Sequence, residues 1–323
     1  MAARYGARVL RSARGSGLIG IAVLTLLAGC ASDPLAENRR ANQRIARLLP
    51  VLETRQDADS LAAAAVLAFA STPEQRLELI SRATAIAPER PALAWLHVSL
   101  CQRVPACDAE PLEARLRALD PGNGVSWLDP VSRATAASDP AALETALAAL
   151  GRSERVDLYW ARLVHDLTLA AERTRQWPTP EALVTVIGGL AAQAIPAFYA
   201  TSRACQDAAL DGPARVATCR GVARAFMHSD SLIVEMVGFG VGKRVWSVES
   251  SEGQAMRASE TVVRYRMTAA GKLDPFLLWN AKGAAQFLDD LDRYPNEEQM
   301  VRARLARAGR PAEPPATHDR PTR

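Results

Sequence analysis

From about Asp57 onward the chain has the apolar pattern of consecutive helices. The stretch 60–70 is rich in alanine and leucine, and helical segments continue to about Ala308. Alternating runs of β-branched residues bounded by turn residues are nearly absent, so a sheet is not expected. The sequence therefore predicts an all-α fold.

Prolines and hydroxyl caps divide this pattern into separate helices. A charged helix is expected over residues 37–49, ended by Pro50. The next clear start is Thr72-Pro73, a hydroxyl cap followed by proline in the first turn, and this helix is expected to reach about Ala87. Further helices are expected near residues 181–194, 196–205, 213–227, 232–245, 249–269, 275–291 and 296–308.

Three tryptophans mark an internal repeat. Trp95, Trp127 and Trp160 are nearly evenly spaced, and the similar phrases at 85–88 and 118–121 precede the first two. A helix comes after each tryptophan, then a break, then a second helix. The tryptophans are expected to pack between paired helices; the alternative is that they are aromatic anchors lining a groove.

This spacing resembles that of tetratricopeptide-type helical hairpins, whose period is about 34 residues. The resemblance covers about 57–177 and is degenerate, because the small residue that the family places four after the tryptophan is matched by Ser99 alone. It implies a superhelix of hairpins over 57–177, followed by an irregular helical part over 178–309. Residues 310–323, rich in proline and without large apolar residues, are expected to form a disordered tail.

Composition and charge narrow the class of protein. Of 323 residues, 49% are hydrophobic and 23% are charged, which is a globular balance that excludes wholesale disorder. Lysine and arginine total 39 against 35 aspartate and glutamate, and the difference equals the four arginines of the first 29 residues. A chain that begins after them has no net charge, so nucleic acid is not an expected partner.

The N-terminus has the features of an export signal. Basic residues precede the apolar stretch 18–28, which is too short to span a bilayer, since a span requires about 20 residues. Leu27-Ala28-Gly29-Cys30 comes next and resembles the lipobox of bacterial lipoproteins. This implies that residues 1–29 are removed, that Cys30 carries lipid, and that 30–56 form a tether and short helix.

The lipobox resemblance also bears on location. An aspartate directly after the lipidated cysteine would indicate retention at the inner membrane, but that position is Ala31. The expected location is the outer membrane, facing the periplasm. The only expected cofactor-like group is the covalent lipid on Cys30, with no soluble cofactor.

Four further cysteines agree with export. Cys101, Cys107, Cys205 and Cys219 are an even set in an exported chain, which indicates two disulfides. Of the three possible pairings, Cys101–Cys107 with Cys205–Cys219 is the simplest, because each pair straddles a break between helices. A metal site using His97 and Cys101 has no supporting ligand spacing, so no metal is expected.

No catalytic set is apparent in the sequence. His165 and Asp166 are adjacent on an expected helix and should diverge. The segment Ser229-Asp230-Ser231 is interpreted as a cap of the helix after it. The glycines at 238, 240 and 242 are interpreted as a close contact between helices, not as a phosphate loop. The carboxylates of 289–292 are interpreted as a solvated helix face, and the arginines of 302–310 as complementing a helix end.

The resulting hypothesis is a membrane-anchored lipoprotein that takes part in protein interaction or assembly in the cell envelope, without catalysis. Its expected partners are the membrane, through the lipid, and a protein of the envelope. One alternative is an envelope enzyme with a site around His228 and Glu235. Another is a structural lipoprotein with no specific partner.

Overall fold

The computed structural model describes residues 34–193, 198–206, 209–273 and 277–315. The predicted signal segment and Cys30 lie outside the described residues. The chain divides into two units after Ile45, and of the first unit only residues 34–45 are described. Helix α2 (Pro34–Arg55) crosses this boundary, and the later described helices belong to the second unit.

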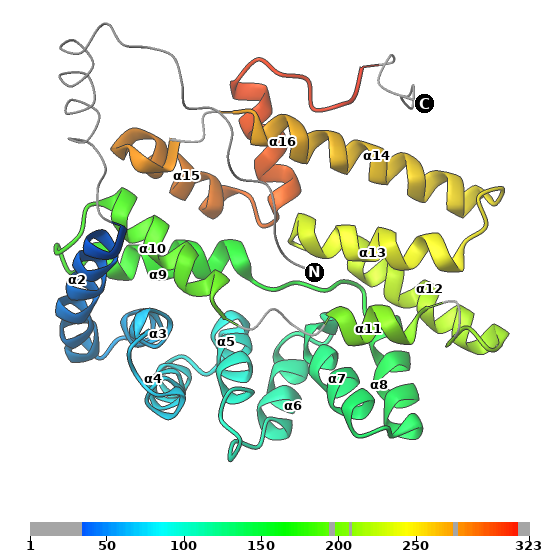
Figure 1. Ribbon diagram of the computed structural model, residues 1–323, viewed down its shortest axis with the longest axis horizontal. Coiled ribbons are helices and arrows are strands. Elements are labelled where there is room, and N and C mark those ends of the chain that lie inside the picture. The colour runs from blue at the N-terminus through cyan, green and yellow to red at the C-terminus, as the bar shows by residue number, and fades with distance from the viewer. Residues whose placement is uncertain (1–33, 194–197, 207–208, 274–276, 316–323) are drawn as a thin grey trace, which may run out of the picture. The chain divides into compact units, whose positions relative to one another are not determined.

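The described residues are helical and contain no strand, which confirms the predicted fold class (Figure 1). One isolated bridge pairs Asn123 with Arg155. After α2, the helices are α3 (Ala58–Leu67), α4 (Pro73–Ile86), α5 (Pro91–Cys101), α6 (Glu110–Leu119), α7 (Leu128–Ala136), α8 (Pro140–Arg152), α9 (Trp160–Glu172), α10 (Thr179–Ala191), α11 (Phe198–Ala204), α12 (Pro213–Met227), α13 (Leu232–Val245), α14 (Ser251–Gly271), α15 (Ala281–Arg293) and α16 (Glu297–Arg307), with short 3-10 turns η1 (Gly124–Trp127) and η3 (Leu277–Trp279). None of these described helices is both long enough and apolar enough to cross a bilayer.

Helix α2 corrects one predicted boundary. The prediction that Pro50 ends it is wrong, because the helix continues through Pro50 to Arg55. Leu48 and Leu52 are completely buried on either side of the proline. Burying a leucine contributes about 1.5–3 kcal/mol, comparable with the roughly 3 kcal/mol that an internal proline costs, so tertiary packing overrides the local signal.

The first eight helices after α2 form four hairpins. Their first helices begin at residues 58, 91, 124 and 160, counting η1 with α7. The members of each hairpin pack against one another, namely α3 with α4, α5 with α6, α7 with α8, and α9 with α10. The predicted start of α4 is confirmed, because Thr72 and Gln75 form a reciprocal capping box.

The fourth hairpin, α9 and α10, packs back against the first helix of the first hairpin. Helix α9 packs against α3, and α10 packs against both α9 and α3. Arg90 fixes this return, with its guanidinium 2.6 Å from Asp59 of α3 and 2.6 Å from Asp166 of α9. The fold therefore brings together segments about a hundred residues apart.

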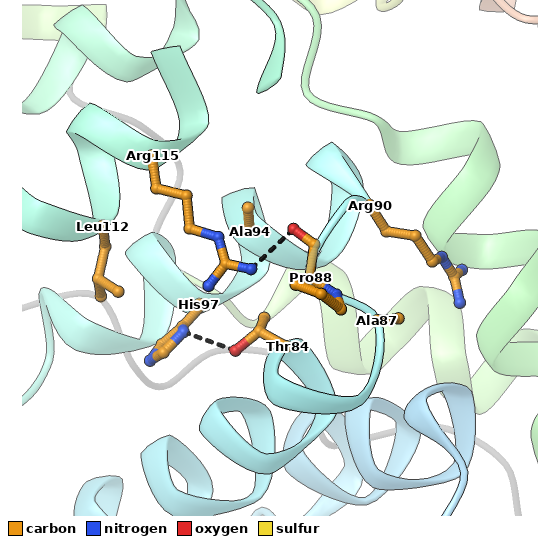
Figure 2. Close-up of a pocket in the computed structure, with 8 residues that line it drawn as sticks. All are labelled: Thr84, Ala87, Pro88, Arg90, Ala94, His97, Leu112 and Arg115. Carbon is orange, nitrogen blue, oxygen red and sulfur yellow. Dashed lines mark hydrogen bonds between the residues drawn. The ribbon is translucent and has the colours of Figure 1, made fainter. Parts of the chain in front are cut away.

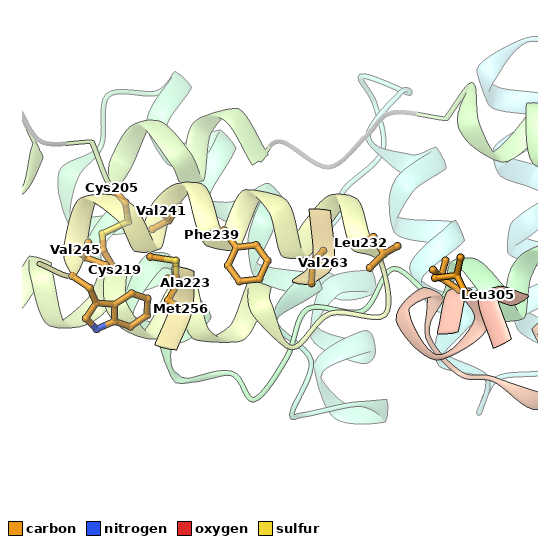
Figure 3. Packing of buried hydrophobic residues seen from close by; sticks show 12 residues of the cluster. Cys205, Cys219, Ala223, Leu232, Phe239, Val241, Val245, Met256, Val263 and Leu305 are labelled. Atoms are coloured by element: carbon orange, nitrogen blue, oxygen red, sulfur yellow. A yellow bond between two sulfur atoms is a disulfide. The ribbon is translucent and has the colours of Figure 1, made fainter. Parts of the chain in front are cut away.

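Helix α8, the second helix of the third hairpin, packs against α12 and so connects the hairpins to the later helices. Gly151 and Gly221 meet at this crossing, where a Cβ on Gly221 would lie 2.1 Å from the carbonyl oxygen of Gly151. Helix α12 packs against α13, which packs against α14, and α14 contacts α16. Figure 3 shows part of the buried core of this region, from the Cys205–Cys219 disulfide to Leu305.

Both disulfides have the predicted local pairing. Cys101 pairs with Cys107 at a Cα–Cα distance of 5.5 Å, closing the end of α5 onto the loop before α6. Cys205 pairs with Cys219 at 5.7 Å, joining the end of α11 to the middle of α12. Cys101 is thus not available as a metal ligand beside His97.

Candidate functional site

A cleft of about 690 Å³ opens between α12, α13 and α14 and is the candidate site. Its apolar wall is formed by Phe239, Trp246, Met256 and Val263, all buried members of the C-terminal core. Its polar lining consists of Arg224, His228, Glu235, Glu252, Ser259, Arg266, Glu298 and Glu313. The volume is in the usual range of small-ligand sites, and the lining combines apolar side chains with an equally large set of polar and charged side chains.

Glu235 is the polar group of the cleft that most needs an explanation. It lies in the first turn of α13 and is only 6% exposed, yet its carboxyl forms no hydrogen bond with any described residue. Burial, together with repulsion from Glu298 and Glu297, raises the pKa of Glu235 to about 8. The side chain is therefore mainly a neutral acid at pH 7.

Arg266 of α14 also lines the cleft, and later segments of the chain hold its side chain in place. Its guanidinium pairs with both Glu298 and Glu313, and its Nε donates to the carbonyl of Ala312 at 2.9 Å. Ala312 and Glu313, in the predicted tail, therefore contact Arg266 of α14, and Glu313 contributes to the cleft. The nearby positive charge is largely compensated by two carboxylates.

His228 lines the same cleft as Glu235, so the structure brings together the two residues of the predicted enzyme alternative. The neighbouring Ser229 does not take part. Its Oγ donates to the backbone carbonyl of Val156 at 2.5 Å and is buried. A Ser–His–Asp arrangement at residues 228–230 is therefore excluded by the direction of the serine.

Asp230 corrects the predicted cap. Its two carboxylate oxygens accept the amides of Leu158, at 2.8 Å, and Trp160, at 3.2 Å, so it holds the segment that enters α9. Helix α13 is capped from α16, because Glu297 Oε2 accepts the amide of Leu232 at 2.8 Å. Both acceptors come from distant segments, which local sequence patterns do not reveal.

The segment entering α9 carries backbone strain. Tyr159 has a left-handed φ of 55°, and its hydroxyl donates to Asp120 at 2.7 Å. Burial, reinforced by the Asp157 carboxylate, raises the pKa of Asp230 to about 7. A smaller hollow lies here, but the carboxylate of Asp230 is already satisfied by the backbone amides, so we interpret this cluster as structural.

One further expectation about acidic residues is wrong, and another is confirmed only in part. His165 and Asp166 do meet, with Nδ1 and Oδ1 3.0 Å apart, because both side chains turn toward one another at one side of α9. Asp166 is also engaged by Arg90 and Arg162, so it serves an ion-pair network. Of the carboxylates expected on a solvated face, Asp289 and Asp292 are exposed as predicted, whereas Asp290 is buried and paired with Arg307 of the basic C-terminal helix.

His97 lies in a hollow of only about 10 Å³, which has room for about one water molecule (Figure 2). Its Nδ1 is 3.1 Å from the hydroxyl of Thr84, and Arg115 donates to the carbonyl of Pro88 at 2.7 Å. Burial, with a smaller contribution from the charge of Arg115, lowers the pKa of His97 to about 4. The residue is a neutral member of the helix packing.

The three repeat tryptophans occupy different positions in their hairpins. Trp95 is 7% exposed within α5 and belongs to the core. Trp127 ends η1, half-buried, with the Arg117 guanidinium 4.5 Å from its ring centre. Trp160 is the first residue of α9 and packs partly against the core around α15.

The predicted close contact at the glycines of α13 holds most clearly for Gly238. A Cβ on Gly238 would lie 2.8 Å from the backbone nitrogen of Met227, so α12 and α13 approach closely there. Gly240 has no neighbouring atom within 4 Å in that direction. All three glycines lie inside a helix and do not form a phosphate loop.

Chemically, the cleft offers a neutral buried acid, a histidine and an arginine paired with carboxylates. Among the described residues no group of three or more histidine, cysteine or acidic side chains is arranged to hold a metal ion. Sequence patterns identify His228 and Glu235 but miss Arg266, Glu298 and Glu313, which lie on α14, on α16 and beyond it. Comparison with known proteins gives no match to a family model, to a curated protein or to a solved structure.

Proposed function

We propose that this chain is a lipid-anchored protein of the bacterial cell envelope that binds a partner without transforming it, and that the cleft lined by Glu235 is its binding site. The observation that carries the proposal is the Glu235 carboxyl, which is buried at the cleft and lacks a hydrogen-bond partner among the described residues. Glu235 lines the cleft, so a ligand bound there would supply the hydrogen bond that the described residues do not give to its carboxyl.

The anchor and the location rest on the lipobox resemblance at Cys30. The helical-hairpin superhelix expected from the sequence would support an interaction role, because stacked hairpins present extended surfaces to partners. This support is by analogy of fold alone. The cleft lies outside the hairpins, between α12, α13 and α14, so it adds an independent argument.

Binding is favoured over catalysis because several polar side chains in and beside the cleft are already engaged in contacts within the protein. Ser229 is turned to Val156, and Arg266 is already paired with two carboxylates. No nucleophile–base pair is formed by the described residues that line the cleft.

Site-specific photo-crosslinking in envelopes tests the proposal. A photoreactive residue at Ser259, exposed on α14 and lining the cleft, should capture a specific partner or ligand. The same residue at Gln254, exposed on α14 but outside the cleft lining, is the matched control. Equal capture at both positions would exclude the cleft as the binding site.

A second candidate function is an envelope enzyme, which the joint position of His228 and Glu235 favours. A carboxylic acid with a pKa of about 8 is suited to general acid catalysis near neutral pH. If the protein is an enzyme, His228→Ala and Glu235→Ala should reproduce the envelope defect of a strain that lacks the protein, while capture at Ser259 persists. Loss of capture together with the phenotype would support the binding function.

A further inference from the structure

We infer that the group bound in the cleft is an organic ammonium carried on an apolar stem, either a free amine or a lysine side chain of a partner. The inference rests on the proposed binding function and names its ligand class. Its basis is the charge around Glu235, the composition of the cleft wall, and the lack of a hydrogen-bond partner for the Glu235 carboxyl among the described residues.

The charges facing Glu235 favour a cation. Glu298 and Glu297 of α16 are the carboxylates that act on it, and Arg266 is the opposing positive charge. Arg266 is itself paired with Glu298 and Glu313, so its charge is offset locally. The titratable and charged groups that line the cleft are Arg224 and His228 from α12 and its end, Glu252 and Arg266 from α14, Glu298 from α16, and Glu313.

Arg224 and His228, the other basic side chains that line the cleft, lie in the last turn of α12 and directly after it. The Arg224 guanidinium lies 5.7 Å from the ring centre of Trp246, at the aromatic end of the wall. His228 ends α12, where it follows the last helical turn. A carboxylate ligand would have to approach Glu235 against Glu297 and Glu298, whereas an ammonium would be attracted by them.

The wall beyond Glu235 is suited to an apolar stem. Phe239 lies one helical turn after Glu235 on α13, on the same side of the helix. Met256 and Val263 of α14 line the cleft with it, and Figure 3 shows these three side chains within the buried core. A stem of several methylene groups could therefore be covered while its ammonium meets Glu235.

Binding is coupled to a proton. The ammonium keeps its own three protons and donates a hydrogen bond to Glu235, while the Glu235 carboxyl releases its proton to the buffer. The products are an ammonium–carboxylate pair and one free proton. No bond between heavy atoms is made or broken.

Titration calorimetry with the full chain tests the inference, using hexylammonium, hexanol and hexanoate as probes. Hexylammonium should bind at least ten times more tightly than hexanol, and hexanoate more weakly than either. Titrations at pH 7 in buffers of different ionisation enthalpy should show release of nearly one proton. A lysine-containing peptide and its acetyl-lysine counterpart form the second arm, and tighter binding of the peptide than of hexylammonium identifies a protein partner as the source.

Glu235→Gln is the decisive variant, because it keeps the shape of the side chain and removes the ionisable group. It should lose at least tenfold in affinity for hexylammonium and abolish proton release, while hexanol affinity stays within twofold. Tighter binding of hexanoate than of hexylammonium, an unchanged Glu235→Gln affinity, or no binding of any probe would overturn the inference. Specific capture at Ser259 despite such results would leave the proposed function standing, whereas capture no greater than at Gln254 would remove that function as well.

Discussion

Gly221 of α12 lies directly against Gly151 of α8, so close that a Cβ on Gly221 would be 2.1 Å from the carbonyl oxygen of Gly151. This contact joins the third hairpin to the helices that form the cleft. Gly221→Ala should therefore force the two helices apart and destabilise the protein by about 1–3 kcal/mol or more, as overpacking does. Denaturant unfolding of the two proteins measures this difference.

Gly240→Ala is the matched control for that substitution. Gly240 also lies within a helix but has no neighbouring atom within 4 Å of the position a Cβ would take. Alanine there should be neutral or should stabilise by up to about 1 kcal/mol, because it favours the helix. Equal destabilisation by both substitutions would mean that the α8–α12 crossing is not specifically tight.

The acid that caps α13 from another helix should matter for stability. Glu297→Ala removes the acceptor of the Leu232 amide and of the Ser231 hydroxyl. Leaving these donors unpaired should lower the free energy of unfolding by about 1–3 kcal/mol. Gln299→Ala, an exposed position on the same helix, should change it by less than about 0.5 kcal/mol.

Removing the charge of Glu235 should flatten the pH dependence of stability. Its pKa is raised from 4.5 to about 8, so the folded protein keeps a proton that the unfolded chain releases as pH rises. The wild-type protein should lose stability across this window. Between pH 5 and pH 9, the free energy of unfolding of Glu235→Gln should fall by about 2 kcal/mol less than that of the wild-type protein, or by a still smaller amount. Unfolding free energies at both pH values provide the measurement, and parallel curves would contradict the raised pKa.

The two disulfides should contribute unequally. Cys205 and Cys219 are 14 residues apart in sequence and Cys101 and Cys107 are 6 apart, so the first closes the longer loop. In the chain-entropy model the double substitutions to alanine should lower stability by about 3 and about 2 kcal/mol respectively. Non-reducing peptide mapping should recover both pairs from exported protein, and free thiols there would contradict the framework.

We predict that membrane attachment depends on Cys30, the residue that the lipobox resemblance marks for lipidation. Cys30→Ser should release the protein from the membrane fraction into the periplasmic fraction. Ser32→Cys, the reverse exchange two residues on with Cys30 intact, should leave the protein attached. Membrane retention of the Cys30→Ser protein would argue against lipidation.

The features that could be predicted from the sequence are those encoded locally. The Thr72 capping box, the hairpin breaks and the two disulfide pairings each depend on residues within about fifteen positions of one another. The features that local patterns miss involve contacts across the chain. Asp230 caps a segment about seventy residues earlier, and Leu52 keeps Pro50 within a helix through burial that no local rule registers.

The candidate site was predictable only in part for the same reason. Glu235 and His228 are close in sequence and could be identified together. Arg266, Glu298 and Glu313 join them only because α14 and α16 pack beside α13 and the chain then returns along α14. The prediction that His165 and Asp166 diverge is wrong because helical geometry alone does not fix side-chain rotamers.

The packing of α9 on α3 has a consequence for how the chain folds. The part of α3 that packs against α9 and α10 cannot be covered until the chain beyond Trp160 is present, so the first hairpin stays incomplete until that later segment is available. Contacts of such long sequence separation slow folding and prolong the exposure of apolar surface. We therefore expect folding to depend on chaperones during the interval in which this part of α3 is uncovered.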